Sequence, residues 1–264
     1  MRIWALGTSS AGNAFLLECE GARVLVDAGF PPRTLAARLA RIGVAPESVE
    51  GVVLTHEHGD HVRGAADGAA RWGWSLSASA GTVAADSDLA AAGARTFHAG
   101  DTLAFSTMTI ATIPVPHDAA EPVALVATAR SSGVRVGIAY DIGHAPEPLA
   151  RALERVDVLV LEANHDETML RDGPYPPVVR ARIAGAYGHL SNRAAAELGA
   201  RCAHRALSAV VLAHLSARCN TPALATQAVR ATLAGSAPRA RTVPAPRAGV
   251  AGPFGAEGQI ELRL

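Results

Sequence analysis

The sequence contains no lysine. All 24 of its basic residues are arginines, and 24 acidic residues balance them to a formal net charge of zero. Together with the high alanine and glycine content, the missing lysine indicates a compositional bias of the genome. The neutral total offers no global field to attract a polyanion. Any phosphate-binding site must therefore be built from arginine, histidine or backbone N–H groups.

Long apolar runs and paired cysteines are missing as well. No apolar stretch approaches the about 20 residues that a membrane-spanning helix needs. The long apolar region of a signal peptide is absent from the N-terminal MRIWALGTSSAGNAF. The three cysteines, Cys19, Cys202 and Cys219, show no CxxC spacing, so we expect reduced and mostly buried thiols. These absences predict a cytoplasmic protein without a membrane segment.

The rest of the composition is typical of a globular domain. The chain has 264 residues, of which 49% are hydrophobic and 18% charged, and it is long enough to bury a large core. No linker divides it, so we predict one domain over residues 1–264, with an exposed loop at Ser236–Gly252 and an edge strand at Gln259–Leu264. Predicted strands come first and then alternate with helices, and the second half repeats this order. That order predicts an α/β fold in which two sheets lie between helices.

The chemistry is concentrated in the stretch Val52–His61, which reads VVLTHEHGDH. Its apolar beginning predicts a buried strand, and Gly59 favours a tight loop after it. Four metal-capable side chains follow within six residues: His56, His58, Asp60 and His61. Because α/β folds place their sites at such strand ends, we prefer a metal site to a polar turn that happens to be rich in histidine. A two-metal site requires further ligands at other strand ends.

Three further candidate ligands occur where such a site needs them. His117, Asp141 and His214 each follow an apolar or β-branched segment that we expect to be a strand. Converging strand ends would supply three histidines to one ion and Asp, His and His to a second, with one bridging carboxylate. Nitrogen and oxygen donors without thiolates suit Zn²⁺, and also Mn²⁺ or Fe. The sequence thus predicts two divalent metal ions, with Zn²⁺ as the first choice.

The HxHxDH motif, followed in order by these three residues, resembles the metallo-β-lactamase superfamily. The resemblance implies a four-layer αββα sandwich with a dinuclear site at one edge of the two sheets. Carried over residue by residue, it assigns the ligands as follows: His56, His58 and His117 for the first metal, Asp60, His61 and His214 for the second, and Asp141 as the bridge.

Other segments resemble the YycJ/WalJ branch of that superfamily over nearly the whole chain. They are Ser9–Asn13, Thr55–His61, His117-Asp118 with Glu121-Pro122, Asp141–Gly143, Leu161–Asp166, Gly188–Asn192 and His214–Ser216. This resemblance implies a cytoplasmic nuclease-type hydrolase with 5′→3′ exonuclease activity on DNA. The sequence departs from the pattern at Gly59, where serine is common, and at Cys219-Asn220, which replaces a paired-Asn motif. Neither departure touches a ligand.

A carboxylate and a histidine add an argument for phosphodiester chemistry. Glu162 ends a predicted strand and His189 opens a predicted helix, an arrangement that resembles the Glu–His pair of tRNA 3′-processing nucleases. A carboxylate next to His189 would raise its pKa and keep it protonated, so that it binds a phosphate oxygen and protonates a leaving alkoxide. Asp60 would orient or deprotonate a metal-bridging water or hydroxide. A helix-capping role is the alternative for His189, and His165 and Asp166 fit structural and chemical roles equally well.

Other functions would use the same ligands. A small-molecule hydrolase acting on a lactone, thioester or cyclic phosphodiester is the main alternative, because one fold hosts many chemistries. Neutral charge and absent lysine favour it, while Glu162 and His189 favour phosphodiesters. An oxygen- or NO-reducing di-iron protein would carry Glu in place of His58, and a catalytically dead scaffold would have lost ligands. The sequence argues against both.

The spacing of the ligands restricts the kind of nuclease. The interval from Asp141 to His214 is too short for the inserted domain of β-CASP nucleases. The interval from His61 to His117 lacks the long flexible arm of the tRNA-processing relatives. We therefore expect a compact nuclease that binds DNA through loops. Four arginines near the motifs are candidate phosphate contacts, with a solvated surface position as the alternative for each: Arg63, Arg171, Arg193 and Arg218.

Overall fold

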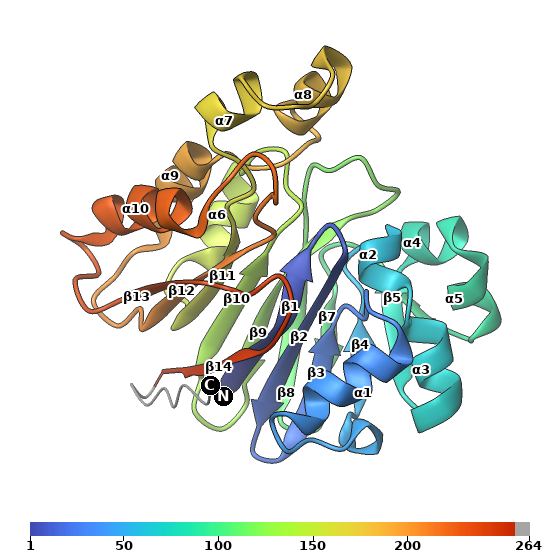
Figure 1. Ribbon diagram of the computed structural model, residues 1–264. Coiled ribbons are helices and arrows are strands. Elements are labelled where there is room, and N and C mark those ends of the chain that lie inside the picture. The colour runs from blue at the N-terminus through green and yellow to red at the C-terminus, as the bar shows by residue number, and fades with distance from the viewer. Residues whose placement is uncertain (257–264) are drawn as a thin grey trace.

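The chain folds into two seven-stranded sheets that pack face to face between helices (Figure 1). The structure, a computed structural model, describes residues 1–256. The first sheet has the order β14-β1-β2-β3-β4-β5-β6. Its strands are β1 (Arg2–Ser9), β2 (Gly12–Cys19), β3 (Ala22–Val26), β4 (Gly51–Val53), β5 (Ser75–Ser79), β6 (Arg95–Phe97) and β14 (Ala251–Gly255).

The second sheet has the order β13-β12-β11-β10-β9-β8-β7. Its strands are β7 (Thr102–Ala104), β8 (Met108–Pro114), β9 (Val123–Ala129), β10 (Arg135–Ala139), β11 (Val158–Glu162), β12 (Ala209–Ala213) and β13 (Arg241–Pro244). Strands β11 and β12 are buried along their whole length and almost entirely apolar, as expected of parallel strands that are covered on both faces.

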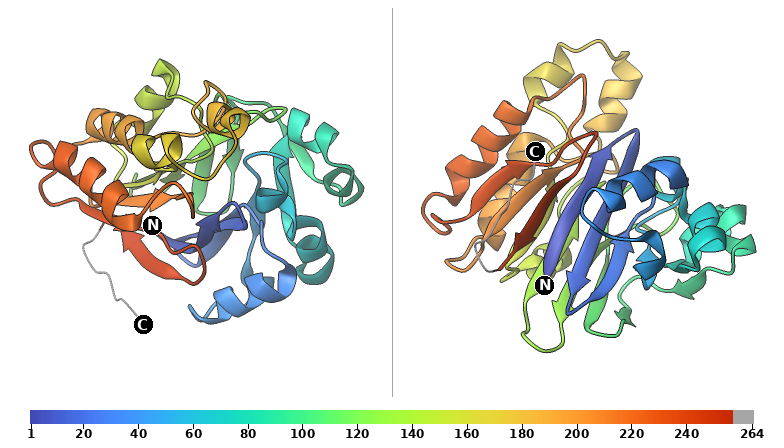
Figure 2. Two further views of the ribbon diagram at one scale, coloured as in Figure 1. Left: turned by 45° about the horizontal axis from the view of Figure 1, so that its top comes forward. Right: turned by 60° about the horizontal axis from the view of Figure 1, so that its bottom comes forward.

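Helices cover the outer face of each sheet (Figure 1, Figure 2). On the first sheet lie α1 (Pro32–Ala40), the 3₁₀ turn η1 (Pro46–Ser48), α2 (Gly59–Val62), α3 (Ala65–Trp72), α4 (Ala80–Ala85) and α5 (Ser87–Ala91). The second sheet is covered by α6 (Glu147–Leu153), α9 (Asn192–Cys202) and α10 (Pro222–Leu233), while α7 (Glu167–Arg171) and α8 (Pro177–Ile183) form an arm beyond the strand ends. Three apolar clusters fill the three interfaces between the layers. The predicted αββα sandwich is confirmed.

The two sheets are built alike, and this positions the site. Each begins with antiparallel strands and continues with four parallel strands, β3 to β6 in the first sheet and β10 to β13 in the second. The carboxyl ends of parallel strands lie at one edge of a sheet. The segments that follow β3, β4, β10, β11 and β12 therefore meet at a common edge of the sandwich.

Several predicted elements coincide with the structure, and others are divided. The apolar runs Val123–Ala129 and Ala209–Ala213 predict strands, and β9 and β12 have these bounds. Thr221-Pro222 predicts the start of a helix that runs to about Leu233, and the side chain of Thr221 accepts a hydrogen bond from the N–H group of Leu224 at the start of α10. The helix expected from Val62 to about Arg71 breaks near Gly64. The helix expected over Thr82–Ala92 breaks at Asp86, whose carboxylate caps α5. A side chain able to accept from free N–H groups starts a new helix there.

One prediction is wrong in part: Ser236–Gly252 is not a continuous loop. It contains all of β13 and the start of β14, which pairs with β1 at the edge of the first sheet. The signal was weak because β13 is short, begins with arginine and ends with Pro244. Proline is tolerated in a strand at the edge of a sheet, where β13 lies. The edge strand expected at Gln259–Leu264 falls outside the described residues.

The three cysteines are buried, as the sequence predicts. Cys19, Cys202 and Cys219 are buried, and none of them forms a disulfide within the part of the chain that the structure describes. Among residues 1–256, no helix is both long enough and apolar enough to cross a membrane.

Candidate metal centre

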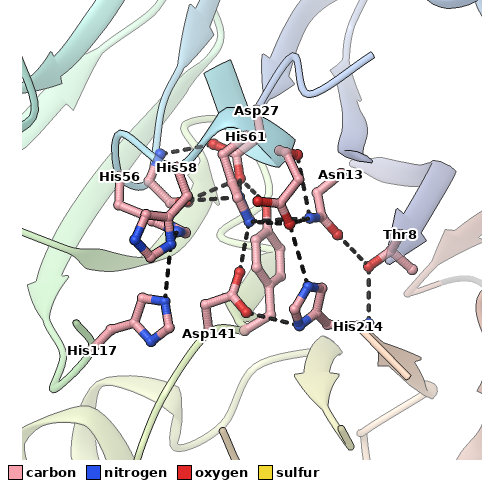
Figure 3. Close-up of polar contacts among 12 residues, drawn as sticks. Thr8, Asn13, Asp27, His56, His58, His61, His117, Asp141 and His214 are labelled. Carbon is pink, nitrogen blue, oxygen red and sulfur yellow. Dashed lines mark hydrogen bonds and ion pairs between the residues drawn. The ribbon is translucent and has the colours of Figure 1, made fainter. Parts of the chain in front are cut away.

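All seven predicted metal ligands lie together at the edge where the parallel strands end, and Figure 3 labels six of them. The loop after β4 and the short helix α2 carry four of them, and the others follow β8, β10 and β12. Their donor atoms form groups within 4.8 Å: His56, His58 and His117; Asp60, His61 and His214; and His56, His61 and Asp141. A fourth group contains Asp141, Glu162, His189 and His214. His56, His61, Asp141 and His214 each belong to two of the groups, so the groups overlap in one cluster.

One half of the cluster consists of three imidazoles. Nε2 of His56 lies 3.0 Å from Nδ1 of His58, and Nε2 of His117 lies 3.4 Å from the same atom. Burial, followed by the nearby charge of His61, lowers the pKa of His56 well below its usual value. Burial likewise lowers the pKa of His117. At neutral pH these two rings can offer lone pairs to a cation without first losing a proton.

The other half combines carboxylates with two histidines whose pKa values are raised. The two oxygens of Asp141 lie 2.7 Å from Nε2 of His61 and 2.8 Å from Nδ1 of His214, and Asp60 lies 3.4 Å and 3.5 Å from the same two histidines. Burial opposes protonation of His61, but Asp27 and Asp141 raise its pKa well above the usual value. The pKa of His214 is raised in the same way, mainly by Asp141 against burial. A divalent cation bound here would displace those protons.

Three buried atoms test whether the site suits a metal. Both carboxylate oxygens of Asp141 and Nε2 of His214 have no hydrogen-bond partner within residues 1–256. Ring nitrogens of His61 and His214 lie within ion-pair distance of the Asp141 oxygens, but not in hydrogen-bond geometry. The donor atoms therefore point toward common centres, as metal ligands do. A buried carboxylate that accepts no hydrogen bond is costly. Divalent cations held by nitrogen and oxygen donors would satisfy these atoms, and the residues present fit such ions.

Sequence reasoning missed a buried carboxylate beneath the cluster. Asp27 follows β3 and is fully buried. Its Oδ2 accepts hydrogen bonds from Nδ1 of His61 at 2.6 Å and from the hydroxyl of Tyr140 at 2.6 Å (Figure 3). Its Oδ1 accepts from the N–H group of Thr55 at 2.8 Å. These bonds orient the ring of His61 with Nε2 toward the cluster, as outer partners of metal ligands commonly do. The signal was present, because Asp27 ends an apolar strand just as Asp141 does.

The Gly7–Asn13 loop contacts the metal loop directly. The amide of Asn13 donates to the carboxylate of Asp60 at 3.1 Å, and its oxygen accepts from the hydroxyl of Thr8 at 2.7 Å. The same hydroxyl accepts from the N–H group of His214 at 2.9 Å. Gly29 completes the contact, since a Cβ there would lie 1.7 Å from the carbonyl oxygen of Asp60. This loop therefore links ligands from both halves of the molecule.

Glu162 and His189 form the predicted pair. Oε1 of Glu162 lies 2.8 Å from Nδ1 of His189, and its Oε2 accepts from the N–H groups of Ile142 and Leu190. Burial opposes both charges, but their mutual attraction lowers the pKa of Glu162 to about 2 and raises that of His189 to about 9. The helix-capping alternative for His189 is wrong, because the side chain of Ser191 caps α9. Among the described residues, all hydrogen-bond partners of the His189 ring lie at Nδ1, which leaves Nε2 for a ligand.

The remaining candidates divide into structural and free groups. Asp166 caps α7 by accepting from the N–H group of Met169, and His165 belongs to none of the four groups of metal donors. Arg171 pairs with Asp172, and Arg193 pairs with Glu167 and Glu197. Arg63 and Arg218 form no ion pair within the described range. Only these last two of the four candidate arginines carry an uncompensated charge.

Sequence comparison places the chain in a family. The metallo-beta-lactamase superfamily matches residues 7–168, so the chain belongs to this superfamily. The fold, the family and the cluster of His and Asp residues together make it a metal-dependent hydrolase that uses divalent metal.

Two relatives are more specific, and one solved structure shares the fold. The chain is 32% identical over 226 residues to exodeoxyribonuclease WalJ of Streptococcus pneumoniae, covering 83% of each chain. It is 28% identical over 238 residues to exodeoxyribonuclease YycJ of Bacillus anthracis, covering 86% of this chain and 87% of that one. The metallo-β-lactamase fold protein YhfI of Bacillus subtilis matches with a TM-score of 0.70 and 15% identity, over 95% of this chain and 99% of that one. The resemblance predicted from the motifs is confirmed.

Proposed function

We propose that this protein is a metal-dependent DNA exonuclease. The observation that carries the proposal is the charged Glu162–His189 pair, which lies against Asp141 at the predicted metal centre. Hydrolysis of a lactone or thioester has no evident need for an imidazolium at this position. The similarity to two exodeoxyribonucleases over more than four fifths of the chain supports DNA as the substrate. A DNA substrate also fits a cytoplasmic location.

In this proposal the seven ligands hold two divalent ions, with Zn²⁺ as the best match to the donor set. The assignment is His56, His58 and His117 for one ion, Asp60, His61 and His214 for the other, and Asp141 shared. Such ions, when bound, polarise a phosphoryl oxygen and lower the pKa of a coordinated water.

Asp60 orients the attacking water. Burial opposes its ionisation, but its contacts with His214 and His61 lower its pKa far below the usual value. As a carboxylate it can accept a hydrogen bond from the water and aim it at the phosphorus. Asn13 fixes the orientation of this carboxylate. Of the two roles considered from the sequence, orientation is therefore favoured.

His189 protonates the leaving group. Its Nδ1 is held by Glu162, so the proton on Nε2 can pass to the leaving oxygen as the bond between that oxygen and phosphorus breaks. The water oxygen forms the new bond to phosphorus, and the water proton goes to solvent. Glu162 is a positioning residue, since it acts through His189.

The test uses protein reconstituted with Zn²⁺ or Mn²⁺ and DNA labelled at either end. We expect stepwise release of nucleotides from one end of single- or double-stranded DNA, no activity after treatment with a chelator, and recovery when metal is restored. RNA, a small thioester and a lactone are assayed in parallel. Hydrolysis of the small substrates alone would replace the proposal with a small-molecule hydrolase, and digestion of RNA alone would also contradict it.

A further inference from the structure

A groove runs along the outer edge of the second sheet, between α10 and β13. In Figure 1, α10 lies alongside β13 at the end of the sheet that carries β12. The part nearer the metal centre has a volume of about 750 Å³ and a floor of small apolar residues, among them Ala223, Ala231 and Pro244. The part farther away has a volume of about 540 Å³ and is lined by Arg230, Arg239 and Arg241. Both parts are lined by Arg230 and Ala234 and therefore adjoin each other.

The charge around this groove differs from that of the whole chain. Residues 198–256 contain seven arginines and no aspartate or glutamate, although the complete sequence has a net charge of zero. Of these seven, Arg201 alone forms an ion pair within residues 1–256. The side chains of Arg230, Arg239 and Arg241 are exposed. The groove is therefore lined by positive charge that nothing in the described chain neutralises.

Strand pairing relates the groove to the metal centre. Pro244 lies opposite Leu212, two residues before His214, and Arg241 lies opposite Ala209, five residues before it. At about 3.3 Å per residue, the groove begins about 7 Å from His214 along the strand direction and reaches Arg241 about 17 Å away. A stacked strand with one phosphate per about 3.4 Å would place about five phosphates over that distance.

Arg247, three residues after Pro244, lies beside the segment that follows His214. Its guanidinium donates to the carbonyl oxygens of Leu215 and Ser216, directly after His214. The N–H group of Thr8, in the loop that contacts the metal ligands, donates to the carbonyl oxygen of Pro246. Positive charge therefore continues from the far end of the groove to the edge of the centre.

We propose that this groove binds the single-stranded part of the DNA substrate that extends away from the scissile phosphate. The proposal rests on the nuclease function and adds where the rest of the strand lies. Guanidinium groups bind phosphates and supply most of the affinity for a nucleic-acid backbone. The apolar floor fits the faces of unpaired bases, which a duplex would hide. Both features favour single-stranded DNA as the occupant.

The test compares two triple variants with the same change of net charge. The groove variant is Arg230→Gln, Arg239→Gln and Arg241→Gln. The control variant is Arg33→Gln, Arg41→Gln and Arg95→Gln, which changes exposed arginines in the first half of the chain. Binding of a labelled 20-nucleotide strand is measured by fluorescence anisotropy over a series of salt concentrations. Steady-state digestion of 4- and 20-nucleotide strands is measured with the metal-loaded proteins.

The groove variant should no longer prefer the longer DNA strand. Because each phosphate contact contributes about 0.7 to the slope of log K against log salt for single strands, the slope should become shallower by about two. The KM for the 20-nucleotide strand should rise about tenfold, and the preference for this strand over the short one should disappear. The control variant should match the wild type in slope and in length preference.

Several results would overturn the assignment. An unchanged slope and length preference in the groove variant would do so while the wild type still digests DNA, which leaves the nuclease function intact. An equal change in the control variant would show that the loss of net charge, and not the position of the arginines in the groove, causes the effect. Arginine-dependent binding of a glutamate-rich peptide, without any change toward DNA, would assign the groove to a protein partner. If the wild type digests no DNA, the nuclease proposal fails by itself, and the anisotropy measurements still decide whether the groove binds a strand.

Discussion

Three residues of the metal cluster and its support adopt a backbone conformation that costs free energy. Asp27, Asp141 and His214 follow strands β3, β10 and β12 with φ values of 59°, 54° and 53°. Such values are uncommon outside glycine, and each costs of the order of 1–3 kcal/mol. Strain of this kind persists where the surroundings hold it in place and is concentrated at functional sites. The shared conformation indicates that the chain must turn sharply to bring these side chains from strand ends to one centre.

At the residue scale, Asn13 should control how well the second metal is held. Asn13→Ala removes the donor to Asp60 and the link through Thr8 to His214. Loss of such an outer partner costs about 10–100-fold in metal affinity or activity. Metal content after dialysis against a weak chelator and kcat on DNA would both fall.

The matched control for Asn13 is Asn192→Ala. Asn192 is a buried amide that bonds to Asn220. Each variant should lose about 1–3 kcal/mol of stability, because a buried partner is left unsatisfied. Only the Asn13 variant should lose metal. Equal metal content in the two variants would refute the positioning role.

His189→Gln should reveal proton transfer to the leaving group. Loss of a general acid lowers the rate by about 10²–10⁴-fold on DNA, whose alkoxide leaving group needs a proton. The loss should be much smaller on bis(p-nitrophenyl) phosphate, because nitrophenolate leaves without protonation. Metal content should stay at the wild-type level, since His189 is not among the assigned ligands. Equal losses on the two substrates would show that His189 is not the acid.

At the scale of elements, helices α8 and α9 differ in how firmly they are packed against the rest of the molecule. Helix α8 has no buried residue, and Val178 on it is 75% exposed, whereas α9 buries six residues against the second sheet. The arm is joined to the metal edge by the ion pair of Arg182 with Asp118. An exposed ion pair contributes about 0–1 kcal/mol. Helix α8 therefore depends on few stabilising contacts.

Hydrogen exchange should show this difference. Regions with few buried apolar contacts open with a low free energy, so the amides of α8 should exchange much faster than those of α9. Exchange followed by mass spectrometry on the metal-loaded protein resolves the two helices. Similar protection in both would mean that contacts other than burial hold the arm.

The sequence predicted those elements whose signals are local. Helix α10 begins with a threonine cap and a proline and has the predicted bounds, and strand β12 is a pure apolar run. Strand β13 was missed because its position at a sheet edge, which tolerates Pro244, is set by tertiary structure. For the site, histidines in a tight motif were visible from sequence. The supporting roles of Asp27 and Asn13 depend on contacts across 34 and 47 residues, so the position of Asp27 at a strand end was visible but the partners of both residues were not.

At the scale of the whole molecule, the candidate centre joins the two halves of the sandwich. The first half supplies the four ligands of the loop after β4, and the second half supplies His117, Asp141 and His214. The apolar core between the sheets packs the halves together. At the edge, carboxylates and histidines from both halves face one another. Metal ions bound at this edge would connect the two halves at the point where the apolar core gives way to charged side chains.

Metal should therefore stabilise the whole fold. A ligand at 100 times its Kd that binds only the folded state adds about 2.7 kcal/mol per site, and for a domain of this size 1 kcal/mol moves Tm by about 2–4 °C. Calorimetry of chelator-treated protein should show a rise of roughly 5–10 °C per site on addition of Zn²⁺ or Mn²⁺. Mg²⁺ serves as the control, because it prefers oxygen ligands and should have little effect on a histidine-rich site. An unchanged Tm at saturating Zn²⁺, with metal content confirmed, would show that the ions do not link the two halves.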